Sequence, residues 1–218
     1  MNPKAISGLY AVTPESTDTQ WLCDKAAAAL AGGARIVQYR NKTDDRILRR
    51  TQAHRLLELC RDHDALFLIN DDVQLALEVN ADGVHVGRDD AGVALARTTL
   101  GAGKIIGASC YDNLPLALNA QGAGADYVAF GSFYSSTVKP NAVRPTIEFL
   151  RDARDRIAVP IVAIGGIDAD NALPLLDAGA DAIAVVSALF QVSDTLLAAR
   201  ALSNVFMRRS TLHAELYR

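Results

Sequence analysis

The chain has 218 residues, of which 50% are hydrophobic and 22% charged, and these proportions exclude a disordered chain, a collagen and a coiled coil. Lys and Arg number 22 and Asp and Glu 25, so the formal charge is −3 and gives no electrostatic reason to expect nucleic acid as a partner. Small-molecule chemistry is the function class that remains most favoured.

Cysteine usage and local apolarity bear on where the protein resides. Cys23, Cys60 and Cys110 are widely spaced and form no CxxC pair, so neither a disulfide framework nor a zinc site is expected. The first 20 residues lack the apolar stretch of a signal peptide, and no apolar run is long enough to span a membrane. We expect a cytoplasmic protein without a membrane partner.

Short apolar runs rich in Val, Ile, Phe and Tyr recur along the chain. Near-continuous apolarity in such short runs is typical of strands covered on both faces, as in a parallel sheet. The expected strands are residues 8–13, 35–40, 65–70, 83–86, 105–109, 127–131, 161–165 and 182–186.

Stretches with helical spacing of apolar residues separate these runs. The clearest covers residues 45–61, for which Asp44 is the expected N-cap. Pro115, Pro145 and Pro174 fall in or just before a first helical turn, where a missing N–H costs little. The other expected helices are residues 19–30, 72–79, 91–100, 114–120, 147–157, 171–177 and 195–207.

A short motif repeats where a helix gives way to a strand: GGAR at residues 32–35, NADG at 80–83, GADY at 124–127 and GADA at 179–182. Gly or Asn ends each helix, because both tolerate the left-handed conformation that closes it. Eight β/α units of roughly 27 residues each fit a minimal (β/α)8 TIM barrel, an α/β fold that occupies residues 1–218 as one domain.

A doubly wound open sheet is the alternative architecture. Its dinucleotide-binding form would carry GxGxxG after the first strand. The first expected strand is followed by TPESTD instead, and GxGxxG occurs nowhere else in the chain.

In a barrel, the chemistry lies at the carboxyl ends of the strands, where the βα loops gather around one mouth. Gln38, Arg40 and Lys42 end the second expected strand at a spacing of two, which places them on one face as an anion cradle. A surface strand end with solvated basic side chains is the alternative interpretation.

Acidic residues follow the third and fourth expected strands. Asp71 and Asp90 suit a magnesium ion that bridges phosphate oxygens, whereas Asp72 and Asp89 are better explained as helix N-caps. His85 lies within a strand, where a histidine is more often a satisfied structural residue than an acid or base.

Three further segments complete the expected mouth. Gly165 and Gly166 at the end of the seventh strand, with Val186 and Ser187 at the end of the eighth, favour a phosphate site, although Gly165 alone also fits a tight turn. Residues 131–144 form the longest non-periodic stretch and read either as a hydroxyl-rich lid with one lysine or as a solvent loop.

Taken in order over residues 6 to 195, the motifs QYRNK, INDD, DGVHVGRDD, IIGAS, GADYVAFGSFY, IVAIGGI and GADAIAVVS resemble the thiamine-phosphate synthase family. The resemblance implies a (β/α)8 fold and the joining of 4-amino-5-hydroxymethyl-2-methylpyrimidine diphosphate to 4-methyl-5-(2-phosphoethyl)thiazole. The implied products are thiamine monophosphate and pyrophosphate, the implied cofactor is Mg²⁺, and the implied partners are these small-molecule substrates.

The resemblance also implies roles for individual residues. Residues implied to bind substrate are Gln38 at the aminopyrimidine, Arg40, Lys42, Asn70 and Lys139 at the pyrophosphate, Ser136 and Thr137 in the lid, and Gly166, Val186 and Ser187 at the thiazole phosphate. Asp71 and Asp90 match the magnesium ligands, and Ser109 matches a hydroxyl at the reaction centre. Arg40, Lys139 and Ser109 are therefore the expected catalytic residues.

The lid departs from the family pattern, in which Thr-x-Thr-Lys or Ser-Pro-Thr-Lys is usual. Here Val138 stands between Thr137 and Lys139, which removes one hydroxyl that would hydrogen-bond phosphate. A related thiazole tautomerase of the same fold and a non-catalytic barrel that binds a thiamine phosphate are the alternative functions. The sequence leaves the oligomeric state open, and a homo-oligomer is one possibility.

Overall fold

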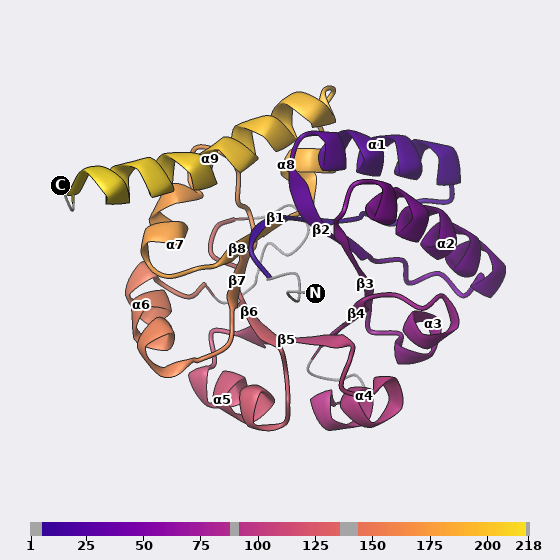
Figure 1. The fold of residues 1–218 in the computed structure, drawn as a ribbon, viewed down its shortest axis with the longest axis horizontal. Coiled ribbons are helices and arrows are strands. Elements are labelled where there is room, and N and C mark those ends of the chain that lie inside the picture. The colour runs from indigo at the N-terminus through magenta and orange to yellow at the C-terminus, as the bar shows by residue number, and fades with distance from the viewer. Residues whose placement is uncertain (1–5, 88–91, 136–143, 217–218) are drawn as a thin grey trace.

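The computed structural model describes residues 6–87, 92–135 and 144–216, with side chains described up to residue 209. The strands are β1 (Gly8–Val12), β2 (Ala34–Tyr39), β3 (Leu66–Asn70), β4 (Gly83–Val86), β5 (Ile105–Tyr111), β6 (Tyr127–Phe130), β7 (Ile161–Ile164) and β8 (Ala182–Val185). They pair in parallel in chain order, and β1 also pairs with β8, which closes the barrel seen end-on in Figure 1. The predicted (β/α)8 fold is confirmed, and the open sheet is excluded.

Helices surround this ring of strands (Figure 1). They are α1 (Thr19–Ala31), α2 (Arg46–Asp62), α3 (Val73–Glu78), α4 (Val93–Leu100), α5 (Leu114–Gly122), α6 (Ile147–Arg156), α7 (Leu173–Asp177), α8 (Ser187–Phe190) and α9 (Thr195–Leu216). The short α8 was not predicted, and α9 runs past the expected end at residue 207. Among the described residues, no helix combines the length and apolarity that crossing a bilayer requires.

The N-cap of α2 differs from the prediction. The Asp45 carboxylate, rather than that of Asp44, accepts the hydrogen bond from the Leu48 backbone N–H. Both residues have the side chain of a good cap, so the local sequence does not choose between them. The choice depends on which residue the preceding loop holds in an extended conformation, and Asp45 has that conformation here.

Alternating side chains along the strands fill two separate layers. On β1, Leu9 and Ala11 point outward into the core between strands and helices, while Tyr10 and Val12 point into the barrel. The period-2 geometry of a strand produces this division. Because most inward residues near the amino ends of the strands are apolar, including Ile36 and Leu66, the polar residues of the interior gather toward the other end.

The repeated helix-to-strand motif has a structural basis that the sequence showed only in part. Gly33, Asn80, Gly124 and Gly179 all have positive φ, between 55° and 108°, as the predicted left-handed helix ends require. Three of the four repeats contain an Asp, and the role of this Asp was not predicted. The carboxylates of Asp82, Asp126 and Asp181 accept hydrogen bonds from the backbone N–H groups of Phe67, Ile106 and Ile161, near the starts of β3, β5 and β7.

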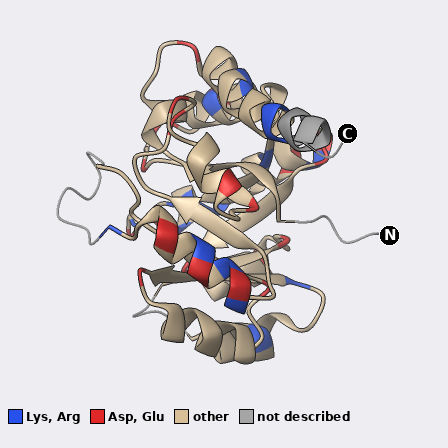
Figure 2. Ribbon diagram, turned by 90° about the vertical axis from the view of Figure 1, so that its left-hand side faces the viewer, with Lys and Arg blue, Asp and Glu red and all other residues tan. Residues whose placement is uncertain are grey.

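Charged residues of both signs are interspersed on the side of the molecule shown in Figure 2. Arg151 and Glu148, for example, form an ion pair on α6 at 3.7 Å. This mixture agrees with the small formal charge of −3.

Candidate active site

A cavity of about 640 Å³ opens at the carboxyl ends of the strands. Every strand contributes to its wall, with Tyr10, Gln38, Asn70, His85, Ser109, Tyr127, Ile164 and Val185 each coming from a different strand. The cavity therefore lies where the chemistry of a barrel is expected.

Arg40 lies on one rim of this cavity, directly after β2. Its backbone N–H donates to Thr13 Oγ1 at 3.0 Å, and its guanidinium Nη1 donates to Glu15 Oε1, also at 3.0 Å. Both side chains of the ion pair are partly exposed. An anionic ligand can therefore take the place of the Glu15 carboxylate, because the pair has little burial to hold it together.

Asp71 directly follows β3, close to the rim on which Arg40 lies. Its Oδ2 accepts from Asn70 Nδ2 at 2.6 Å and lies 3.5 Å from Lys42 Nζ, while its Oδ1 accepts from the Gly87 backbone N–H at 3.2 Å. Its φ of 63° is in the left-handed region, which is uncommon for a residue other than glycine and is often found at functional sites. Asp72, in contrast, caps α3 as predicted.

The opposite rim is formed by the segments after β7 and β8. Gly165 and Gly166 have φ values of 107° and 65°. A Cβ on Gly166 would lie 2.4 Å from the carbonyl oxygen of Ser135, so only glycine fits here. Val186 and Ser187 follow β8 at the start of α8, and all four residues line the cavity. This rim presents backbone and one hydroxyl rather than charged side chains.

The segment after β6 is anchored at its beginning. Phe133 donates its backbone N–H to Ile164 O at 3.1 Å, and Tyr134 donates to Gly165 O at 2.9 Å. The expected lid residues Ser136, Thr137 and Lys139 lie outside the described residues. The anchored part belongs to the wall of the cavity, because Gly131 and Ser132 line it.

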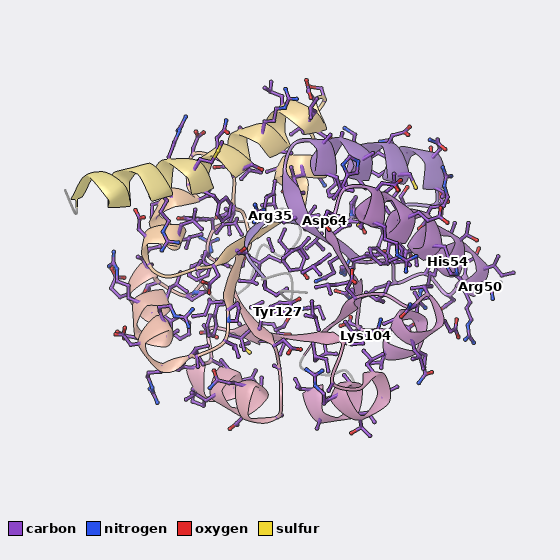
Figure 3. The ribbon with its side chains drawn as sticks, in the orientation of Figure 1. Arg35, Arg50, His54, Asp64, Lys104 and Tyr127 are labelled. Carbon is purple, nitrogen blue, oxygen red and sulfur yellow. The ribbon has the colours of Figure 1, made fainter. Side chains whose placement is uncertain are left out.

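A continuous series of hydrogen bonds crosses the cavity floor. Gln38 Nε2 donates to Tyr10 Oη at 2.6 Å, and Tyr10 Oη lies 2.8 Å from Tyr127 Oη. His85 Nδ1 lies 2.8 Å from Tyr127 Oη, and its Nε2 lies 2.8 Å from Ser109 Oγ. Figure 3 shows Tyr127 inside the ring of strands. The series thus links residues of five different strands.

Burial keeps the members of this series neutral. Desolvation lowers the pKa of His85 to about 4 and raises the pKa of Tyr127 well above its usual value. His85 is therefore an uncharged imidazole near neutral pH. Both ring nitrogens are hydrogen-bonded, which agrees with the interpretation of His85 as a satisfied residue rather than a free acid or base.

Comparison with known proteins places this barrel in a family. The profile described as thiamine monophosphate synthase matches residues 9–189. The chain belongs to the thiamine monophosphate synthase family.

Relatives in this family are similar over nearly the whole chain. A thiamine-phosphate synthase from Nitrosospira multiformis is 53% identical over 95% of this chain and 88% of its own length. One from Chromobacterium violaceum is also 53% identical, over 95% of this chain and all of its own. The solved structure of a thiamine phosphate pyrophosphorylase from Pyrococcus furiosus has a TM-score of 0.82 and 35% identity, covering 92% of this chain and 96% of that one.

The residues predicted from the family resemblance divide into three groups. Those that line the one cavity are Gln38, Arg40, Asn70, Ser109, Gly166, Val186 and Ser187. Lys42 and Asp71 do not line it but are joined to its rim through Asn70. Asp90 lies outside the described residues, as do the three lid residues.

Sequence reasoning missed other residues that line the cavity, among them Tyr10, Tyr127, Glu15 and Gln191. The two tyrosines lie inside apolar strands and look like core residues in the sequence. The alternation along β1 was a usable signal. Tyr10 lies two residues before Val12, so both side chains point into the barrel, and Val12 ends the strand at the mouth.

Ser109 and His85 form a serine–histidine pair that the sequence did not indicate. The third partner is the Tyr127 phenol and not a carboxylate, and the lowered pKa of His85 makes it a weak base. The pair is therefore poorly suited to activate a nucleophile.

Proposed function

We propose that this chain joins 4-amino-5-hydroxymethyl-2-methylpyrimidine diphosphate to 4-methyl-5-(2-phosphoethyl)thiazole, giving thiamine monophosphate and pyrophosphate. The names of the family and of its relatives support this reaction. The observation that carries it is a single cavity with cationic and amide side chains on one rim and a glycine-rich backbone on the other. Two different phosphorylated substrates need two such rims.

The reaction requires a leaving group to be stabilised and a cation to be captured. The C–O bond between the pyrimidine methylene and the diphosphate breaks, and the oxygen keeps the electron pair. The electron-rich aminopyrimidine spreads the positive charge on the methylene. The lone pair of the thiazole nitrogen then forms the new C–N bond, so no protein nucleophile is needed.

Arg40, Asn70 and Lys42 are the described residues suited to hold the diphosphate. The Arg40 guanidinium matches phosphate oxygens in geometry and charge once it exchanges Glu15 for the ligand. Asn70 contributes an amide at the cavity wall. Lys139 is proposed to add a further positive charge over the leaving group. These groups act by neutralising charge as it develops.

Asp71 and Asp90 are proposed to hold Mg²⁺. The carboxylate oxygens of Asp71 fit a hard divalent cation, and this carboxylate is already held at the rim by Asn70 and Gly87. When bound, the ion would neutralise the charge of the diphosphate. We expect Asp71→Asn, which keeps a residue that tolerates positive φ, to raise the Mg²⁺ concentration for half-maximal activity by tenfold or more.

The glycine rim is proposed to bind the phosphate of the thiazole substrate. Backbone N–H groups at Gly165 and Gly166 can approach an anion closely because no Cβ intervenes. The Ser187 hydroxyl adds a hydrogen-bond donor. Between the two rims, Val162 and Ile164 give the floor the dry surface that a reactive cation needs, since water would capture it.

The proposed function is tested by mixing both substrates with Mg²⁺ and measuring pyrophosphate and thiamine monophosphate. Equal amounts of the two products are expected, with no turnover when either substrate or the metal is omitted. Isomerisation of a thiazole carboxylate phosphate without pyrophosphate release would favour the tautomerase. Tight binding without turnover would favour the non-catalytic barrel. Cytoplasmic location and homo-oligomer formation stay predictions.

A further inference from the structure

The hydrogen-bond series on the cavity floor needs one hydrogen more than its interior members can supply. Tyr10 and Tyr127 are buried phenols, and the buried ring of His85 bonds two hydroxyl groups and no carboxylate, so each is neutral and offers one hydrogen. The series has four hydrogen bonds, each of which needs one hydrogen. The fourth must come from one end, which is either Gln38 or Ser109.

Two arrangements satisfy this count with every interior hydrogen used within the series. If Gln38 donates to Tyr10, every hydrogen points toward Ser109, and His85 carries its hydrogen on Nε2. If Ser109 donates to His85, every hydrogen points the other way, His85 carries its hydrogen on Nδ1, and the Gln38 oxygen faces Tyr10. In the structure Gln38 Nε2 lies 2.6 Å from Tyr10 Oη, which corresponds to the first arrangement.

The first arrangement determines what the two ends offer a ligand. Gln38 Oε1 has no hydrogen-bond partner among the described residues and remains an acceptor. Ser109 accepts from His85 and so keeps its own hydroxyl hydrogen to donate. Both residues line the cavity. The cavity therefore presents an acceptor on β2 and a donor on β5.

We propose that Tyr10, Tyr127 and His85 are positioning residues that fix this hydrogen-bond polarity, so that the site selects a ring with a donor facing Gln38 and an acceptor facing Ser109. This rests on the proposed function. A 4-aminopyrimidine offers an amino donor and ring-nitrogen acceptors. Its 4-oxo counterpart replaces the amino donor by a carbonyl acceptor and protonates a ring nitrogen, which reverses the pattern. Reversed polarity leaves buried polar groups unpaired, and such sites discriminate strongly.

The first test is the tautomer of His85 in the ligand-free protein. Long-range ¹H–¹⁵N NMR spectra of histidine-labelled protein at pH 7.5 distinguish hydrogen on Nε2 from hydrogen on Nδ1, and His85→Asn assigns the signal. The Nε2–H tautomer is expected. The Nδ1–H tautomer, or an equal mixture of the two, would overturn the proposed polarity.

The second test compares binding of two diphosphates by calorimetry, without thiazole phosphate. One is the 4-amino-5-hydroxymethyl-2-methylpyrimidine diphosphate and the other its 4-oxo counterpart. Tyr127→Phe breaks the series while keeping the ring, so the preference for the amino compound should fall by about tenfold or more. The matched control is Tyr39→Phe, which removes a buried phenol that bonds Gln52 outside the barrel interior.

An unchanged preference in Tyr127→Phe, or an equal loss in Tyr39→Phe, would overturn the inference. If Tyr127→Phe does not fold, Tyr10→Phe breaks the same series at its neighbouring bond, and the wild-type tautomer still decides the polarity. If the wild-type protein releases pyrophosphate but neither Tyr127→Phe nor Tyr10→Phe changes the preference for the amino compound, this inference alone is rejected. The expected preferences without pyrophosphate release would reject the proposed function alone.

Discussion

The two ends of the barrel use carboxylates in different ways. At the amino ends of the strands, Asp126 accepts from the Ile106 N–H at 2.7 Å and from Arg97 at 2.6 Å, and Asp181 accepts from the Ile161 N–H and from Arg154. At the mouth, Glu15 binds Arg40 only through side chains. The ion pairs of Asp126 and Asp181 are part of the backbone hydrogen bonding, whereas the Arg40–Glu15 pair at the mouth is open to exchange with a ligand. The first should control stability and the second activity.

The largest effect is expected from Arg40→Ala. Loss of one preorganised charged donor should lower kcat/KM by about 100-fold or more, because the leaving group then develops charge without its main described partner. The melting temperature should stay within about 2 °C of wild type, since the pair with Glu15 is partly exposed. Steady-state kinetics and calorimetry measure the two quantities.

Arg50→Ala is the matched control, because Arg50 points away from the barrel on α2 (Figure 3). It removes the same side chain and should leave both activity and stability unchanged. A large loss of stability in Arg40→Ala would contradict the separation between the two ends.

Mild acid should lower the free energy of unfolding through His85 on the cavity floor. The pKa of His85 falls from 6.5 to about 4 on burial, so between these values the unfolded chain binds a proton that the folded chain does not. Stability therefore falls as pH drops from 6.5 toward 4, by about 1.4 kcal/mol per pH unit and about 3 kcal/mol in all.

Urea unfolding at several pH values measures this slope. In His85→Asn the same acidic side chains titrate but the buried imidazole is gone, so the difference in slope isolates His85. Parallel slopes in the two proteins would show that His85 takes up a proton in the folded state without cost.

At the other end of the barrel, Asp181→Ala should destabilise the fold by about 2 kcal/mol, because it leaves the buried Ile161 N–H without its carboxylate partner. Urea unfolding measures the loss. The kcat of the folded fraction should equal that of wild type, since Asp181 lies far from the mouth along β8. A selective loss of kcat would contradict the division of roles.

The smallest effect is expected from Glu15→Gln. Removing the negative charge releases Arg40 from its pair, so the KM for the pyrimidine diphosphate should fall by about twofold, in line with the modest strength of exposed ion pairs. The kcat should change little. A rise in KM would indicate that Glu15 orients Arg40 rather than competing with the ligand.

The sequence alone was sufficient for the fold because its signals are local. Apolar runs predicted all eight strands, and Gly or Asn at the repeated junctions predicted the positive φ values that were found at Gly33, Asn80, Gly124 and Gly179. Once the strands are parallel and in order, their carboxyl ends must meet, so Gln38 and Arg40 could be assigned to the mouth without coordinates, and the family resemblance added Asn70 and Ser109.

Only the tertiary structure decided how the interior side chains pair. Tyr10 and Tyr127 are 117 positions apart, and their hydrogen bond depends on the register of the closed barrel and on side-chain direction, which no local pattern encodes. The same holds for the bond between His85 and Ser109 and for the carboxylates that bind strand starts. Periodicity reports which residues are buried, but hydrogen-bond partners across a barrel are set by distances that arise only when the ring of strands closes.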